Sequence, residues 1–285
     1  MKPAVFEYQE PRSLGEAVAV LATPGRECVV LAGGQSLVPL LNLRRVRPRI
    51  VVDVNQVPEL TGVHITDDVV RIGAMTRLRD IERHAGLRSA LPVLPETAAL
   101  VAYPQIRTRT TIGGSLCHAD PAAELPTLAV ALGARLLLRS ARGDRIEDAE
   151  SFFAPPGTSR RPDELLTEIE LPRRQGFRFR FEEATRSGGF PLVGVCLGVR
   201  VDERGLVAEA LVAAGGVAEH PVRLPAGERL LHGRDLAGNV DDVVSAVSAV
   251  LTPPTNTHAT AGYRHALLRT LLRRAAAALA TGGGN

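Results

Sequence analysis

The chain has 285 residues, 45% of them hydrophobic and 23% charged, with 34 lysines and arginines against 31 aspartates and glutamates. The length predicts two domains that can bury a large ligand, the composition is typical of a globular protein, and the small basic excess argues against a nucleic-acid partner. No apolar run reaches the about 20 residues of a membrane span and no signal peptide is evident, so we expect a cytoplasmic protein. The three cysteines do not have the spacing of a disulfide framework, a metal site or an iron–sulfur cluster. Any redox centre is therefore expected to be organic or to lie on another chain.

The first 55 residues predict a small α/β unit. Residues 13–23 predict a helix with Ser13 as its N-cap and Glu16 three residues later, as in a capping box. A buried strand over 27–34, a short helix over 35–43 and a second strand over 48–55 are expected next. This order directs backbone amides toward a ligand at the loop between the first strand and the helix.

A second α/β unit is predicted from Gln56 to Arg174. Its expected elements are a strand over 68–75, a helix over 77–87, a helix and a strand within 127–140 with Gly133 closing the helix, and a strand over 163–172. The proline-rich segment 91–126 predicts irregular structure, apart from a helix that begins near Pro121.

Beyond Gln175 the pattern predicts antiparallel β structure followed by helices. A half-buried strand is expected over 177–186, and two long strands within 190–217 are joined at Asp202–Gly205. The end of the chain predicts helices over 239–251, with Asn239 as the cap, and over 262–280.

Two glycine pairs stand out by their context. The 27 glycines give about two or three adjacent pairs by chance, so a pair alone indicates nothing. Gly33-Gly34, however, follows a buried strand and precedes Ser36 and a helix, where unpaired N–H groups can bind a phosphate. Ser36 could cap that helix or donate its hydroxyl to the phosphate. Gly113-Gly114 has similar surroundings, so the two loops either close on a pyrophosphate or are two unrelated tight turns.

Familiar nucleotide motifs do not account for these loops. Neither contains the GxGxxG pattern with its downstream acid, nor the GK[ST] of a nucleoside triphosphatase.

The segments themselves resemble the FAD-binding medium subunit of molybdenum hydroxylases, the family of carbon monoxide dehydrogenase and xanthine dehydrogenase. The resemblance is carried, in order, by residues 31–48, 111–134, 152–172, 179–201 and 262–275.

The resemblance implies an α+β fold of the vanillyl-alcohol-oxidase (PCMH) type. It would comprise an FAD-binding domain over 1–174, with subdomains of about 1–55 and 56–174, and a C-terminal domain over 175–285 with an antiparallel sheet and helices. FAD would be the cofactor, with no metal bound by this chain. The residues implied to wrap its pyrophosphate are Ala32, Gly33, Gly34, Gln35 and Ser36 from one side, and Thr111, Ile112, Gly113, Gly114 and Ser115 from the other.

Further residues complete the expected cofactor site. By the resemblance, Glu124 matches an acidic position near the adenosine half of FAD, and Leu166 matches a backbone contact to the flavin ring. Leu37, His118 and Asp120 directly follow the two loops and are assigned to the same site. Asp120 has two other interpretations, as the cap of the helix near Pro121 or as the partner of His118 in a catalytic pair.

The chain departs from the family pattern in one segment. Family members commonly have an aspartate at the position of Gly189 and a small residue at the position of Pro191. Both changes fall where the C-terminal domain would approach the flavin.

The function implied is electron transfer within a complex. Substrate would be hydroxylated on a large molybdopterin-binding subunit, and electrons would cross a small [2Fe–2S] subunit to FAD and then pass to oxygen, NAD or a quinone. The assembly would be a heterotrimer or a dimer of heterotrimers. Two alternatives stay open: a stand-alone flavoprotein oxidase or dehydrogenase that uses residues such as Cys117 and His118, and a scaffold subunit without flavin.

Overall fold

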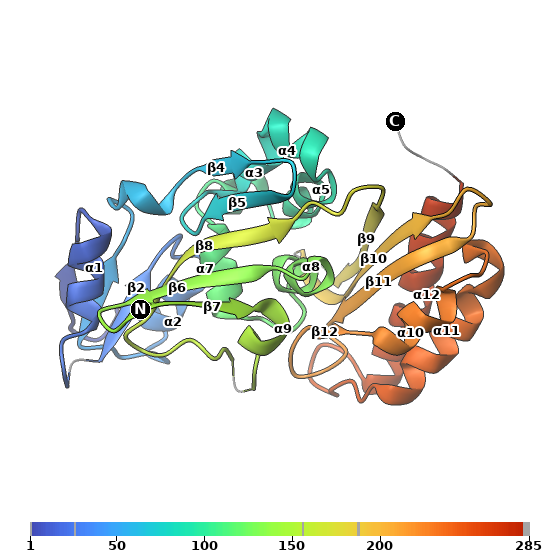
Figure 1. Ribbon diagram of the computed structural model, residues 1–285. Coiled ribbons are helices and arrows are strands. Elements are labelled where there is room, and N and C mark those ends of the chain that lie inside the picture. The colour runs from blue at the N-terminus through green and yellow to red at the C-terminus, as the bar shows by residue number, and fades with distance from the viewer. Residues whose placement is uncertain (1, 26, 156, 187–188, 282–285) are drawn as a thin grey trace.

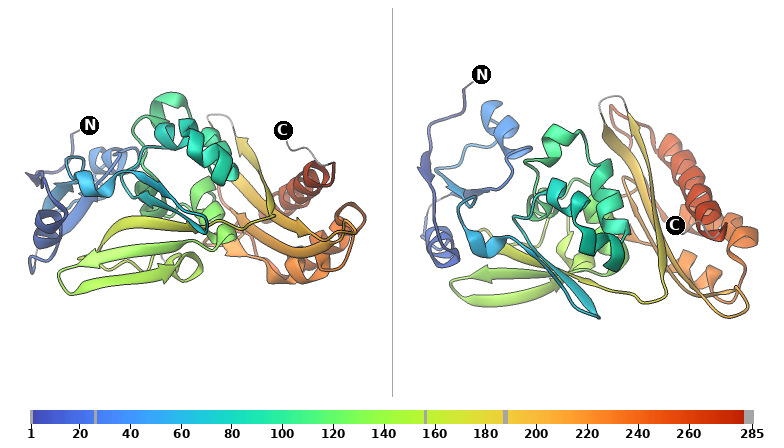
Figure 2. Two further views of the ribbon diagram at one scale, coloured as in Figure 1. Left: turned by 45° about the horizontal axis from the view of Figure 1, so that its top comes forward. Right: turned by 90° about the horizontal axis from the view of Figure 1, so that it is seen from above.

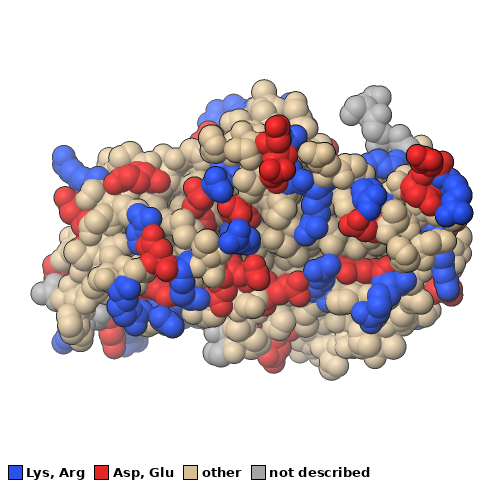
Figure 3. Space-filling model, viewed as in Figure 1, with Lys and Arg blue, Asp and Glu red and all other residues tan. Residues whose placement is uncertain are grey.

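The computed structural model describes residues 2–25, 27–155, 157–186 and 189–281. Three β-sheets with their helices follow one another in chain order along an elongated molecule, from the N-terminal unit through a middle unit to the C-terminal unit (Figures 1 and 2). Basic and acidic side chains alternate over the face shown in Figure 3. None of the helices in the described residues is long and apolar enough to cross a membrane.

The N-terminal unit is a three-stranded parallel sheet in the order β1-β3-β2. Its elements are β1 (Glu7–Gln9), α1 (Leu14–Leu21), β2 (Cys28–Leu31), α2 (Leu37–Asn42) and β3 (Ile50–Asp53). The helix cap predicted at Ser13 is confirmed, because its hydroxyl accepts from the Glu16 amide at 3.2 Å. The Glu16 carboxylate accepts from the amide of Arg12, one residue before the cap, at 2.7 Å.

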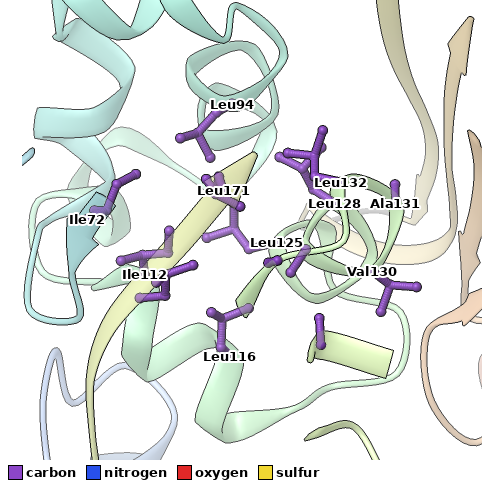
Figure 4. Packing of buried hydrophobic residues seen from close by; sticks show 14 of the residues in the cluster. Ile72, Leu94, Ile112, Leu116, Leu125, Leu128, Val130, Ala131, Leu132 and Leu171 are labelled. Atoms are coloured by element: carbon purple, nitrogen blue, oxygen red, sulfur yellow. The ribbon is translucent and has the colours of Figure 1, made fainter. Parts of the chain in front are cut away.

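The middle unit contains a five-stranded antiparallel sheet in the order β4-β5-β8-β6-β7. Its strands are β4 (Val63–Ile65), β5 (Val69–Gly73), β6 (Arg135–Ser140), β7 (Gly143–Asp148) and β8 (Leu165–Pro172). Its helices are η1 (Pro58–Leu60), α3 (Leu78–Arg83), α4 (Ala85–Ala90), α5 (Val93–Leu100), α6 (Pro104–Arg107), α7 (Ile112–His118), α8 (Glu124–Leu132) and α9 (Ala149–Phe152). Leu94, Leu116, Leu128 and Leu171 meet in the core between sheet and helices (Figure 4).

The prediction of irregular structure over 91–126 is wrong. The segment forms α5, α6, α7 and the start of α8, because its prolines lie where helices tolerate them: Pro92 at an N-cap, Pro104 at a first position and Pro126 in a first turn. The single helix expected over 77–87 is divided at His84, whose ring accepts from the Leu87 amide at 3.2 Å and caps α4.

The C-terminal unit is an antiparallel sheet in the order β12-β11-β10-β9, followed by helices. Its elements are β9 (Arg178–Arg186), β10 (Phe190–Val201), β11 (Val207–Gly215), β12 (Val222–Arg223), α10 (Pro225–Leu231), α11 (Leu236–Val250) and α12 (Ala261–Ala280). The predicted turn between the two long strands is confirmed. The cap predicted at Asn239 is wrong, because α11 begins earlier and Asp235 accepts from the Gly238 amide at 2.8 Å.

The C-terminal sheet is buried on both faces. Val195, Leu197 and Val212 belong to a core shared with the C-terminal helices. Phe181 and Cys196 instead join the core of the middle unit. The sheet is therefore held between its own helices and the middle unit.

Candidate functional site

The first glycine loop, residues 32–36, connects β2 to α2. Gly34 has φ +76°, a conformation that favours glycine. Gly33 is buried, and a Cβ added to it would lie 2.3 Å from the carbonyl oxygen of Arg109. Gly33 therefore lets this loop approach the segment that leads into the second glycine loop.

The amides of the first loop lack acceptors. In the described part of the chain, no hydrogen bond is made by the N–H groups of residues 33–36, although the carbonyl of Gly34 accepts from Val38 at 3.0 Å. Backbone N–H groups in a half-buried loop require partners, and phosphate oxygens are suitable ones. The Ser36 side chain makes no capping bond, so the structure does not support the first of its two expected roles, the cap of α2.

The second glycine loop is the first turn of α7. Thr111 caps this helix by accepting from the Gly114 amide at 3.0 Å. The amides of Ile112 and Gly113 donate to the carbonyls of Thr76 and Ala74 at 3.1 and 2.8 Å. The first-turn amides are thus already engaged, and this loop differs chemically from the first.

The two loops contact each other. A Cβ added to Gly114 would lie 3.4 Å from the Ala32 Cβ, and 2.7 Å from the Thr111 hydroxyl oxygen. A Cβ added to Gly113 would lie 2.5 Å from the Ala74 Cβ. Gly113 is therefore required by packing within the protein, whereas Gly114 lies where the loops meet and Ser115 follows it, half-buried.

A polar network that the sequence did not reveal holds the loops together. Asn55, just after β3, donates from Nδ2 to the Ala32 carbonyl at 3.0 Å. Arg77 donates to the Asn55 side-chain oxygen and to the Arg109 carbonyl. The Asp53 carboxylate accepts from the backbone amide of Asn55 at 2.9 Å. The sequence signal for this network was Asn55, a polar residue close to the end of the buried parallel strand β3. The end of β3 lies at the same edge of the sheet as the first loop.

Tyr8 extends this network at the N-terminal sheet. Its hydroxyl donates to the Asp53 carboxylate at 2.5 Å, and this bond, with burial, raises the pKa of Tyr8 to about 12. The protonated hydroxyl thus holds one oxygen of the Asp53 carboxylate, whose other oxygen accepts from the backbone amide of Asn55.

Glu124 is the first residue of α8 and is only 4% exposed. Burial, with the negative charge of Asp120, raises its pKa to about 7. Glu183 on β9 is a second such carboxyl, whose pKa is raised to about 8 by burial and by Glu124. One of its oxygens is buried without a hydrogen-bond partner among the described residues. Glu183 lies far from Glu124 in the sequence, and only the fold brings the two carboxyls close enough to interact.

The other predicted residues lie around the loops with less defined roles. Asp120 does not cap α8, because that helix begins at Glu124; its carboxylate instead accepts from the Ala122 amide at 2.9 Å in the preceding turn. His118 is exposed at the end of α7, and Leu37 is the half-buried first residue of α2. Leu166 is buried in β8, opposite Leu138 at an irregularity of the sheet.

The thiol of Cys117 does not support a reactive role. Burial raises its pKa, and the nearby charge of Arg160 opposes this only in part. A thiol of this kind is a poor nucleophile at neutral pH. The described residues contain no cluster of three or more metal-ligating side chains.

Of the two departures, Gly189 directly precedes β10, and Pro191 is the second residue of β10, paired with Thr185 of β9. Gly189 has φ +74°, and a Cβ on it would lie 3.7 Å from the Ala102 Cα in the middle unit. Between them Phe190 is 61% exposed, with the Arg186 guanidinium 5.3 Å from its ring centre. Gly189 therefore lies close to Ala102, in the connection between α5 and α6.

Comparison with known proteins gives matches over nearly the whole chain. Residues 4–174 match the family described as the FAD binding domain in molybdopterin dehydrogenase, and residues 180–279 match the CO dehydrogenase flavoprotein C-terminal domain. The 6-hydroxypseudooxynicotine dehydrogenase complex subunit alpha of Paenarthrobacter nicotinovorans is 37% identical, over 96% of this chain and 94% of that protein. The carbon monoxide dehydrogenase medium chain of Hydrogenophaga pseudoflava is 34% identical, over 96% and 97%.

Solved structures agree. Quinoline 2-oxidoreductase from Pseudomonas putida superposes with a TM-score of 0.93 at 30% identity, covering 99% of both chains. The predicted α+β fold, with an FAD-binding part and a C-terminal part, is thereby confirmed.

Proposed function

The chain belongs to the family of FAD-binding medium subunits of molybdenum hydroxylases, and we propose that within an oxidoreductase complex it accepts electrons from iron–sulfur clusters and passes them to an external acceptor. Bound FAD supplies the electron exchange, while the protein binds the cofactor and orients it. Oxygen, NAD or a quinone would serve as the acceptor.

The observation that supports this proposal most strongly is the run of free amides at residues 33–36. These N–H groups and the Ser36 hydroxyl would hold the FAD diphosphate. The second loop would close the site from its other side through Gly114, where no side chain intervenes, and through the Ser115 hydroxyl. Asn55 and Arg77 would fix the distance between the loops, because their bonds join the backbone at Ala32 to that at Arg109.

The remaining assignments follow the family. Leu37, His118, Asp120 and Glu124 would lie beside the cofactor, and Leu166 would contact the flavin through its backbone. We assign residues 1–174 to the FAD-binding domain and 175–285 to the C-terminal domain. Phe181 and Cys196 then form part of the contact between the two.

Partner subunits would carry the other redox centres. The three cysteines do not have the spacing of an iron–sulfur motif. We propose a large molybdopterin-binding subunit and a small [2Fe–2S] subunit as partners, in a heterotrimer or a dimer of heterotrimers in the cytoplasm.

Two measurements test this function. The purified chain should bind one FAD, with the visible spectrum of an oxidised flavin, and a small substrate alone should leave that flavin oxidised. In the complex purified with its partners, substrate should reduce the clusters first and the flavin afterwards in rapid-mixing spectra. Flavin bleaching by a small substrate in the isolated chain would contradict the electron-transfer role.

A further inference from the structure

The connection between α5 and α6 contains an unusual backbone conformation. Ala102 has φ +45°, and only two other non-glycine residues among those described, Arg44 and Ala119, have a positive φ. A side chain makes this region unfavourable, so neighbouring groups must hold the turn in place. Backbone outliers of this kind concentrate at ligand sites.

A buried arginine holds this turn. Arg107, the last residue of α6, is 7% exposed and donates from one terminal nitrogen to the carbonyls of Val101 and Ala102 at 3.2 and 3.1 Å. Its other nitrogens donate to both carboxylate oxygens of Glu82 on α3, at 2.9 and 3.3 Å. The guanidinium thus ties α3 to the backbone on either side of the strained peptide.

The Ala102 turn lies beside the C-terminal unit, close to Gly189. Gly189 lies opposite Ala102, and three apolar side chains beside this meeting point are exposed. Leu100, Tyr103 and Phe190 expose 40%, 55% and 61% of their surface. The Ala102 turn and the start of β10 therefore carry exposed apolar side chains at the place where the two units meet, which suits the flat, partly apolar ring of a flavin.

We infer that Arg107, held by Glu82, is a positioning residue that fixes the Ala102 turn as one wall of the flavin site. This inference rests on the proposed function, in which this chain binds FAD. Arg107 would act through the backbone carbonyls of the turn, without touching the cofactor itself.

The test is the flavin of the Arg107→Lys holoprotein. Lysine cannot reproduce the fork that binds one carboxylate and two carbonyls at once. We expect FAD to be retained through the first glycine loop, with affinity reduced by about tenfold, and the visible absorption maxima and midpoint potential of the flavin to shift. Adding Ala102→Gly should move both back toward the wild type, because glycine adopts the left-handed conformation without help.

A matched control is available on the β6-β7 hairpin. Arg139 also binds a carboxylate through two nitrogens, those bonds to Asp144 being 2.9 and 2.8 Å, so Arg139→Lys should leave the flavin unchanged. If Arg107→Lys fails to fold, Glu82→Gln gives the same readouts while keeping the guanidinium. A lower melting temperature with an unaltered flavin spectrum and potential would show that the arginine only stabilises the fold. Absence of FAD from the wild-type protein would instead refute the proposed function.

Discussion

We expect Ser36 to contribute to FAD binding without contributing to the stability of α2. Its hydroxyl caps nothing, so Ser36→Ala should leave the free energy of unfolding nearly unchanged while weakening FAD binding by about tenfold, the loss of one hydrogen bond to a charged group. Flavin fluorescence titration and urea unfolding measure the two effects.

Ser13 provides the matched control. It caps α1 with a bond of 3.2 Å, so Ser13→Ala should lower stability by about 1 kcal/mol and leave FAD affinity unchanged. A loss of stability in Ser36→Ala equal to that of the control would mean that Ser36 supports the helix after all.

The paired carboxyls of Glu124 and Glu183 make stability depend on pH. Their pKa values in the folded chain, about 7 and about 8, lie above the ordinary value of 4.5. Between pH 4.5 and about 8 the folded state therefore binds more protons than the unfolded state, so stability should fall as pH rises through this range and level off above it. Glu183→Gln should flatten this decline.

Urea midpoints at pH 6 and pH 9 measure this effect. The wild type should lose more stability than Glu183→Gln between these two values. Equal losses in both proteins would show that the Glu183 carboxyl ionises freely in the folded chain.

Among the secondary-structure elements, α7 packs so closely in its first turn that Gly113 has no room for a side chain. A Cβ on Gly113 would lie 2.5 Å from the Ala74 Cβ and 2.7 Å from its carbonyl oxygen, so Gly113→Ala should destabilise the protein by about 1–3 kcal/mol. Gly262 in α12 has nothing within 4 Å of such a Cβ, and Gly262→Ala should be neutral or stabilising. Similar melting temperatures for the two variants would refute the close approach of α7 to Ala74.

The elements that the sequence predicted are those with strong local patterns. The strands β2 and β3 are continuous apolar runs and α1 has its cap in the sequence, so α1, β2, α2 and β3 were predicted in order, whereas the short strand β1 was missed. The helices α5 to α7 were missed because their prolines suggest breaks, although each occupies a position that a helix tolerates. In the site, the two glycine loops could be recognised in the sequence. Asn55, Arg77 and Arg107 could not, because they form hydrogen bonds with residues 22 to 32 positions away or with nearby backbone, and no local pattern reveals such bonds.

At the scale of the whole molecule, the middle and C-terminal units share a core. Phe181, Cys196 and Ala213 pack into the middle unit, and the Gly216 amide donates to the Pro121 carbonyl at 2.7 Å. Calorimetry should therefore show these two units unfolding in one transition, and a fragment of residues 1–174 should melt at a lower temperature than the full chain. Two separate transitions, with the fragment as stable as the full chain, would show that the units are independent.

We propose that the free amides of the first glycine loop bind the FAD diphosphate, whereas those of the second already donate to acceptors within the protein. Hydrogen–deuterium exchange resolved to single residues tests it directly. Without FAD, the amides of residues 33–36 should exchange rapidly and those of Ile112, Gly113 and Gly114 slowly. With FAD bound, exchange at 33–36 should slow strongly while 112–114 change little. Rapid exchange at 33–36 in the FAD-bound protein would contradict the account.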